Sequence, residues 1–218
     1  MMAEEKLHRK PFLALLGSSR KKLLQAFLLT AVTSSIISLF LYLPTYLSTI
    51  IKIQTSHSYL INLISFLSFA LMTAFFGRYS DKVNREKLVV LGASLLIVFS
   101  YPLFNGLATF GEPFIWIFTL GFSLFGAMIN GSYVVLIAES FPAHSRYSGV
   151  GFSYSLGVAL FGGTAPLVFT GLINYLNFVE APSLYLSGCA VLTLFAALSY
   201  QLDKRQTAFD SSSDVVNV

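Results

Sequence analysis

Long apolar stretches alternate with short polar connections along the whole chain. Each apolar stretch approaches or exceeds the roughly 20 residues that a helix needs to cross about 30 Å of hydrocarbon. Backbone polar groups in lipid must be satisfied within such a segment, which excludes isolated strands. The pattern therefore predicts an all-α membrane protein with six transmembrane helices. The predicted helices, none of which contains Asp, Glu, Lys or Arg, cover residues 23–50, 58–77, 88–106, 113–137, 147–173 and 183–202.

The composition agrees with this pattern. Hydrophobic residues make up 55% of the chain and charged residues 11%, whereas an ordinary soluble domain is roughly 25% charged. The single cysteine, Cys189, excludes an intramolecular disulfide and a cysteine-rich metal site, and we expect no metal and no cofactor. The net charge of +4 does not indicate nucleic-acid binding, because the basic residues flank apolar stretches instead of interleaving with aromatic residues.

Lysine and arginine gather on one side of the predicted bundle. Six precede the first helix, four lie in the connection 78–87, one lies in the connection 139–146 and two follow the last helix, whereas the opposite connections hold only Lys52. Because cytoplasmic flanks retain positive charge, we expect both termini in the cytoplasm and the helices in a bacterial inner membrane. The expected domains are a basic cytoplasmic segment (1–22), a six-helix transmembrane domain (23–202) and a disordered cytoplasmic tail (203–218).

The connection between the second and third helices concentrates charge. It reads GRYSDKVNREK from residue 77 to residue 87, and it resembles the G-x-x-[SA]-D-[RK]-x-[GN]-R-[RK] signature of the major facilitator superfamily. Asn84 stands where the family usually has Gly, and Glu86 stands where a second basic residue is common. A basic loop that only sets the topology is the alternative interpretation. The positions that match the signature are Gly77, Asp81, Lys82 and Arg85.

The connection after the fourth helix carries a second motif. Residues 139–151 read ESFPAHSRYSGVG, which resembles the E-x-F-P-x-x-x-R-x-[ST]-G connection between the tenth and eleventh helices of that superfamily. The helix that follows looks like the eleventh helix of metabolite:proton symporters of the proline/betaine, shikimate and dicarboxylate type. The resemblance covers about residues 10–202 and implies the C-terminal six helices of a twelve-helix transporter.

The same resemblance implies roles for the charged motif residues. Asp81 corresponds to a residue that locks the cytoplasmic side against the opposite six-helix half. Glu139 and Arg146 are expected to form a local charge network with Arg85. A solvated charge cluster that only sets the topology remains the alternative.

Polar residues recur every four positions along the first predicted helix, where such spacing keeps them on one slowly drifting face. This face can line a substrate path, and small hydroxyl residues can equally pack helices together in lipid, so both interpretations stand. Asn130 and Tyr133, in the fourth helix, can likewise contact substrate or bond across helices. The recurring residues are Thr30, Ser34, Ser38, Tyr42 and Tyr46.

Small residues form two neighbouring rows on the fifth predicted helix. Such small-x-x-x-small patterns favour close helix contact, which we expect here for the first row. Gly162, Gly163 and Pro166 are expected to let this helix bend near the middle of the membrane. The first row, named the small-residue row below, is Gly151, Ser155, Ala159 and Gly163, and the adjacent row is Gly149, Ser153 and Gly157.

No predicted helix holds a carboxylate or histidine, the usual groups that gain and lose a proton inside a membrane. If transport is coupled to protons, the titrating group must come from another polypeptide. The resemblance places most coupling carboxylates in the N-terminal half. The chain also lacks a nucleophile elbow and a phosphate-binding loop, so we do not expect an enzyme.

Two functions remain open from the sequence. In the first, the chain is half of a secondary transporter for a small polar or zwitterionic metabolite, such as an osmolyte, an amino acid or an organic acid. Its partners are then the lipid bilayer, the solute and either a separate N-terminal half or a second copy, because an even number of helices lets two copies lie parallel. In the second, the chain is a non-transporting fragment of a split transporter gene or a membrane scaffold. The start at Met1, inside what resembles the central loop, favours a split gene.

Overall fold

The computed structural model describes residues 20–143 and 145–216, and this part of the chain is helical without any strand. Six of its helical segments are long and apolar enough to cross a membrane, which confirms the predicted fold class. The fifth segment consists of α6, the π-helical turn η2 and α7 in succession. The elements are α2 (Arg20–Thr49), α3 (Thr55–Ser80), α4 (Arg85–Phe110), η1 (Glu112–Phe114), α5 (Ile115–Ser140), α6 (Arg146–Gly157), η2 (Val158–Gly162), α7 (Gly163–Leu176) and α8 (Pro182–Val216).

Several helices extend a few residues beyond the predicted apolar stretches. At the C-terminus the difference is larger, because α8 continues to Val216 where we expected a disordered tail from residue 203. The chain has no Gly or Pro between Gly188 and Val216, so no residue there interrupts the backbone hydrogen bonds of a helix. Of the expected basic segment 1–22, residues 1–19 lie outside the described part of the chain.

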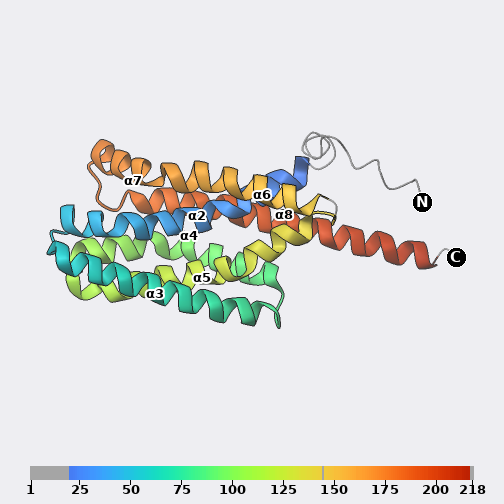
Figure 1. The fold of residues 1–218 in the computed structure, drawn as a ribbon, viewed down its shortest axis with the longest axis horizontal. Helices are drawn as coiled ribbons and strands as arrows, with labels where there is room; N and C mark the ends of the chain where they lie inside the picture. The colour runs from blue at the N-terminus through green and yellow to red at the C-terminus, as the bar shows by residue number, and fades with distance from the viewer. Residues whose placement is uncertain (1–19, 144, 217–218) are drawn as a thin grey trace.

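α2 occupies the centre of the bundle. In its apolar window 78% of the residues are buried, compared with 17% for α3. Figure 1 shows α2 between α3 and α5 on one side and the α6–α7 segment on the other, with α8 alongside. Small residues such as Ala26, Ala31 and Ser35 are fully buried, which lets neighbouring backbones approach α2 closely.

Aromatic residues fill the core where α2, α4 and α5 meet. The ring of Phe104 lies edge-on to Phe118, with 5.0 Å between ring centroids, and edge-on to Tyr46 at 5.7 Å. The hydroxyl of Tyr46 donates a hydrogen bond to the carbonyl oxygen of Val179 at 3.1 Å. A buried tyrosine hydroxyl needs such a partner, and this bond joins α2 to the connection between α7 and α8.

Candidate functional site

The charged motif after α3 forms a compact ion-pair cluster. Arg85, the first residue of α4, places Nη2 2.7 Å from Oδ1 of Asp81 and Nη1 2.5 Å from Oε1 of Glu139. Asp81 caps the C-terminus of α3, and Glu139 lies in the last turn of α5. One guanidinium therefore joins the ends of three helices. Glu139 is the partner that the resemblance implied for Arg85, whereas Asp81 was expected to contact the opposite six-helix half.

Arg146 lies in a different position from the one expected. Its Nε donates to the backbone carbonyl oxygen of Phe141 at 3.3 Å. The ion pairs described for Arg85 are with Asp81 and Glu139, and none is described between that cluster and Arg146. The bend at Phe141, whose backbone is extended after α5, turns its carbonyl toward Arg146 at the start of α6. Arg146 thus stabilises the connection between α5 and α6, and it is not one of the ion-pair partners described for Arg85.

The motif glycine marks a close helix crossing. A Cβ placed on Gly131 of α5 would lie 2.6 Å from the backbone nitrogen of Gly77 in α3. Real Cβ atoms do not approach so closely, so α3 and α5 pack in this way only because Gly131 lacks a side chain. The sequence reasoning singled out Gly77 and missed Gly131, although a glycine inside an apolar helix is the signal for such a crossing. Lys82, also in the motif, is exposed.

Two further ion pairs attach α8 to the same end of the bundle. Lys204 lies 2.6 Å from Glu86, and Lys21 lies 2.5 Å from Asp203. Gln25 donates to the other carboxylate oxygen of Asp203 at 2.9 Å. None of these contacts follows from the sequence, because each joins residues that are more than a hundred positions apart. The available signal in the sequence was Gln25, because a lone amide near the start of an apolar stretch indicates a polar partner on another helix.

The polar stripe on α2 faces the fifth segment. Thr30, Ser34 and Ser38 are buried, with exposed fractions of 0%, 5% and 6%. Gly157 lies directly against Thr30, and Gly162 lies against Ser34 and Ser38. The contacts of these three residues are therefore packing contacts, and their place in a substrate path stays a prediction. Tyr42, also in this stripe, is half-buried, and its hydroxyl accepts a hydrogen bond from Oγ1 of Thr170 at 3.1 Å.

The two candidate residues of the fourth predicted helix lie on α5. Nδ2 of Asn130 lies 3.4 Å from Oγ1 of Thr73 in α3, a distance at the long end for a hydrogen bond. Asn130 is half-buried and Tyr133 is buried, with 4% of its surface exposed. Asn130 thus has a partner on a neighbouring helix, and a contact of either residue with substrate remains a prediction.

The fifth segment changes geometry where a bend was predicted. A π-helical turn spans Val158–Gly162, next to Gly163 and four residues before Pro166. Pro166 has no backbone N–H and leaves the carbonyl of Gly162 without its α-helical donor. Oγ of Ser38 donates to that carbonyl at 2.7 Å, and the hydroxyl of Tyr185 donates to the carbonyl of Phe161 at 2.7 Å. Hydroxyl groups from α2 and α8 therefore donate the hydrogen bonds that these two carbonyls of the π-helical turn accept.

The small-residue row does not make the helix contact that we expected of it within this chain. Gly151, Ser155, Ala159 and Gly163 are all exposed, and a Cβ on Gly151 would meet nothing within 4 Å. The adjacent row, with Gly149, Ser153 and Gly157, is buried instead. Periodicity identifies rows along a helix but does not say which row faces the bundle, so the prediction selected the wrong one for this contact.

Comparison with known proteins agrees with the motifs. The sequence model of the Major Facilitator Superfamily matches residues 3–166. A Staphylococcus haemolyticus protein that carries the name of a proline/betaine transporter is 35% identical over 69% of this chain. The citrate-proton symporter of Klebsiella pneumoniae is 26% identical over 86% of the chain, and the ectoine/proline transporter ProP of Corynebacterium glutamicum is 29% identical over 66%.

The chain spans less than half the length of these relatives. The matched regions make up 32% of the staphylococcal protein, 43% of the citrate-proton symporter and 29% of the ectoine/proline transporter. No solved structure matches the chain.

Proposed function

Because this chain belongs to the Major Facilitator Superfamily, we propose that it forms one six-helix half of a secondary transporter for a small polar or zwitterionic metabolite. Membership of this family makes the chain an integral membrane protein of a transporter family, and not an enzyme. The other half comes from a separate chain, and it supplies the group that couples transport to protons. Both termini of the chain face the cytoplasm.

The observation that carries this proposal is the chemistry of the exposed face of the fifth segment. Besides the small-residue row, the fifth segment exposes the polar side chains of Tyr154, Thr164 and Thr170, together with the apolar Leu160 and Leu167 at 49% and 75%. On α3 a comparable row at four-residue spacing consists of large apolar side chains, since Leu63, Leu67 and Leu71 are 65%, 58% and 64% exposed. Large apolar side chains suit contact with lipid, whereas polar and small residues suit a protein partner or a water-filled path. We infer that the second half covers the fifth segment.

Support for the solute class comes from the relatives. Their printed names refer to proline, betaine, ectoine and citrate, all of which are small and polar. The hydroxyl groups at the surface of the fifth segment, together with Tyr42, offer hydrogen bonds without a fixed charge. Such a wall suits a zwitterion better than a tricarboxylate, because each carboxylate of citrate needs a cationic partner when it is desolvated.

Support for coupling from another chain is the absence of Asp, Glu, His, Lys and Arg from the six predicted membrane stretches. Proton-coupled transporters place such groups inside the membrane. The same absence favours the alternative function, in which the chain is a non-transporting fragment or a scaffold for other helices. The two functions differ in whether a second half restores transport.

Reconstitution tests the proposal. The chain is placed in liposomes alone, or with the N-terminal six helices of the staphylococcal relative, and uptake of labelled proline, glycine betaine and citrate is measured under an imposed pH gradient. We expect uptake of a zwitterion only when both halves are present, and we expect a protonophore to abolish it. Proton-coupled uptake by the chain alone would contradict coupling from another chain. Absence of uptake in the mixed liposomes, with both halves inserted, would favour the non-transporting alternative.

A reporter fused after residue 216 tests the orientation. We expect alkaline phosphatase at this position to be inactive in bacterial cells and green fluorescent protein to be bright, because only the latter works in the cytoplasm. An active phosphatase would contradict the cytoplasmic assignment of the C-terminus.

A further inference from the structure

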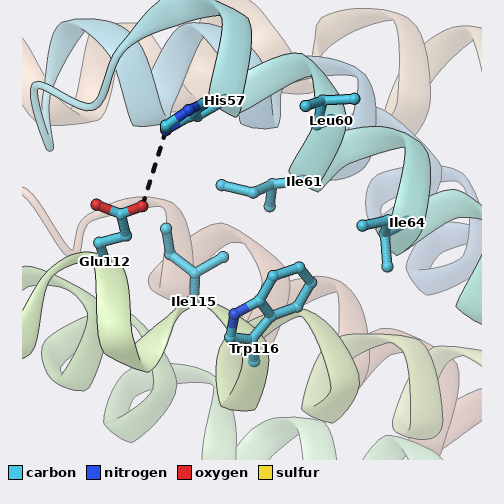
Figure 2. Close-up of a pocket in the computed structure, with 7 residues that line it drawn as sticks. All are labelled: His57, Leu60, Ile61, Ile64, Glu112, Ile115 and Trp116. Atoms are coloured by element: carbon cyan, nitrogen blue, oxygen red, sulfur yellow. Dashed lines mark ion pairs between the residues drawn. The ribbon is translucent and has the colours of Figure 1, made fainter.

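A pocket lies between α3 and α5 at the end of the bundle opposite the start of α2, on the left in Figure 1. Its volume is about 250 Å³, slightly below the roughly 300 Å³ at which pockets for drug-sized ligands begin. Figure 2 shows α3 and α5 as its two walls, with the indole of Trp116 opposite the aliphatic side chains of α3. The lining residues are His57, Leu60, Ile61, Ile64, Glu112, Ile115 and Trp116.

The charged groups of this pocket lie at one edge of it. Nδ1 of His57 faces Oε1 of Glu112 across 4.0 Å, and the two side chains are 57% and 65% exposed (Figure 2). His57 lies in the first turn of α3, and Glu112 begins η1. Below this edge the walls are apolar apart from the indole N–H. The carboxylate of Glu112 is therefore the negative charge that a ligand meets at this edge.

The other charged side chains at this end of the described chain lie on different connections. Lys52 is in the connection between α2 and α3, and Glu180 is in the connection between α7 and α8. Neither residue lines the pocket. The electrostatic character of the mouth is set by His57 and Glu112.

We propose that this pocket binds a small organic cation from solution, with an alkylammonium group beside Glu112 and an apolar part against Leu60, Ile61 and Ile64. The carboxylate attracts a cation and repels an anion. The face of an indole ring also attracts an ammonium group within about 6 Å of the ring centre. The small volume favours a compact solute over a two-chain lipid. This site lies away from the α2 and α6–α7 interface, so the proposal does not depend on the transport function.

The chain provides its own reporter for this site, because Trp116 is its single tryptophan. The experiment titrates the full chain, purified in the uncharged detergent dodecyl maltoside, with hexyltrimethylammonium and follows tryptophan emission. We expect a saturable change in emission at pH 8. Hexanesulfonate, which has the same chain length and the opposite charge, is expected to cause no saturable change.

Two variants test the role of the Glu112 carboxylate. Glu112→Gln is expected to weaken binding about fivefold, the factor for roughly 1 kcal/mol from one partly exposed charge. Glu180→Gln is the matched control, since it removes a carboxylate at the same end of the bundle but outside the pocket, and it is expected to leave binding unchanged. Circular dichroism and gel filtration establish that each variant is folded.

Two results would overturn the proposal. The first is an equal, unsaturable response of the parent chain and Glu112→Gln, which would show that the probe only partitions into the micelle. The second is displacement of the probe by a short-chain phosphatidylethanolamine at a lower concentration than the probe itself requires. That result would assign the pocket to the ammonium group of a lipid instead of a dissolved cation.

Discussion

At the scale of single residues, glycines decide how closely the helices approach one another. Gly157 and Gly151 lie on the same helix, α6, six residues apart. A Cβ added to Gly157 would lie 2.8 Å from Cβ of Thr30 and still closer to its hydroxyl, whereas a Cβ on Gly151 would meet nothing within 4 Å. Because both positions are helical, replacement by alanine gives the same gain in helix propensity at each, and any difference reports the contact with α2.

Gly157→Ala is expected to destabilise the chain by about 1–3 kcal/mol, the usual cost of overpacking a tight contact. Gly151→Ala is expected to stay within about 0.5 kcal/mol of the parent chain. Thermal unfolding in detergent, followed by the loss of the monodisperse gel-filtration peak, measures both. Equal melting temperatures for the two variants would show that α6 does not lie against Thr30.

The cluster around Arg85 depends on one cation shared by two carboxylates. Arg85 is 28% exposed, whereas Asp81 and Glu139 are 65% and 43% exposed. An arginine guanidinium stays protonated at any pH near neutral, so the cation of this cluster is permanent. Its contribution to stability is modest because exposed ion pairs are typically worth 0–1 kcal/mol.

A double-mutant cycle with Arg85→Gln and Glu139→Gln is expected to give a coupling free energy of about 0.5–1 kcal/mol, at the upper end for surface pairs. Denaturation in mixed detergent micelles provides the unfolding free energies. The coupling should decrease as salt is raised from 0.1 M to 1 M, because the Debye length falls from about 10 Å to about 3 Å. Arg78→Gln, which removes a nearby positive charge, serves as the control. A coupling near zero at low salt would contradict the ion pair.

At the scale of elements, the fifth segment is the irregular member of the bundle. The π-helical turn and Pro166 leave backbone carbonyls that neighbouring helices must satisfy, and π-helical turns occur often at functional sites. The hydroxyl groups of Ser38 in α2 and Tyr185 in α8 donate hydrogen bonds to two carbonyls of this segment. The segment can bend only if these bonds adapt, so they couple its shape to the position of two other helices.

Ser38→Ala and Tyr185→Phe are each expected to cost about 0.6 kcal/mol, the average for hydrogen bonds between membrane helices. Amide hydrogen exchange in residues 158–166 should become faster in both variants, because the turn opens locally more often. Ser155→Ala, on the exposed face of α6, is the control and is expected to leave exchange unchanged. Unchanged exchange in all three variants would show that the turn is stable without these hydroxyl groups.

At the scale of the whole molecule, the sequence predicts how many helices cross the membrane, but few of the contacts between these helices. Length and polarity are enough to place six helices, because lipid allows few other structures. Arg85 and Glu139 were paired through family resemblance, and the bend near Gly162 followed from Gly and Pro. The pairing of Lys204 with Glu86 depends on how α8 packs across the bundle, and no local pattern encodes it.

The same limit explains the error about the fifth segment. Both rows of small residues have the same spacing, so the sequence cannot tell which one packs on α2. In the structure the adjacent row does so, and Gly157 contacts Thr30. The small-residue row is thereby left exposed on the outside of the six-helix bundle. The small side chains of this row are therefore available to pack against a second polypeptide, and they do not pack within this chain.

If a second half covers that row, cysteines on it should become protected when the half is present. The test uses a Cys189→Ser background, which has no other cysteine. Ser155→Cys reports the row, and Val98→Cys, at a 61% exposed apolar position on α4, is the control. We expect co-expression with the N-terminal half of the staphylococcal relative to slow maleimide labelling of Ser155→Cys at least severalfold, while labelling of Val98→Cys does not change.

Oxidation of the Ser155→Cys chain alone distinguishes the two kinds of partner. In a dimer of identical chains related by a two-fold axis, a residue near the axis faces its own copy. Such a dimer would bring the two cysteines together and give a disulfide-linked product on a non-reducing gel. We expect no such product, because the proposal assigns this face to a different polypeptide. A disulfide formed by Ser155→Cys and not by Val98→Cys would make the partner a second copy, and the coupling group would then be missing from the whole assembly.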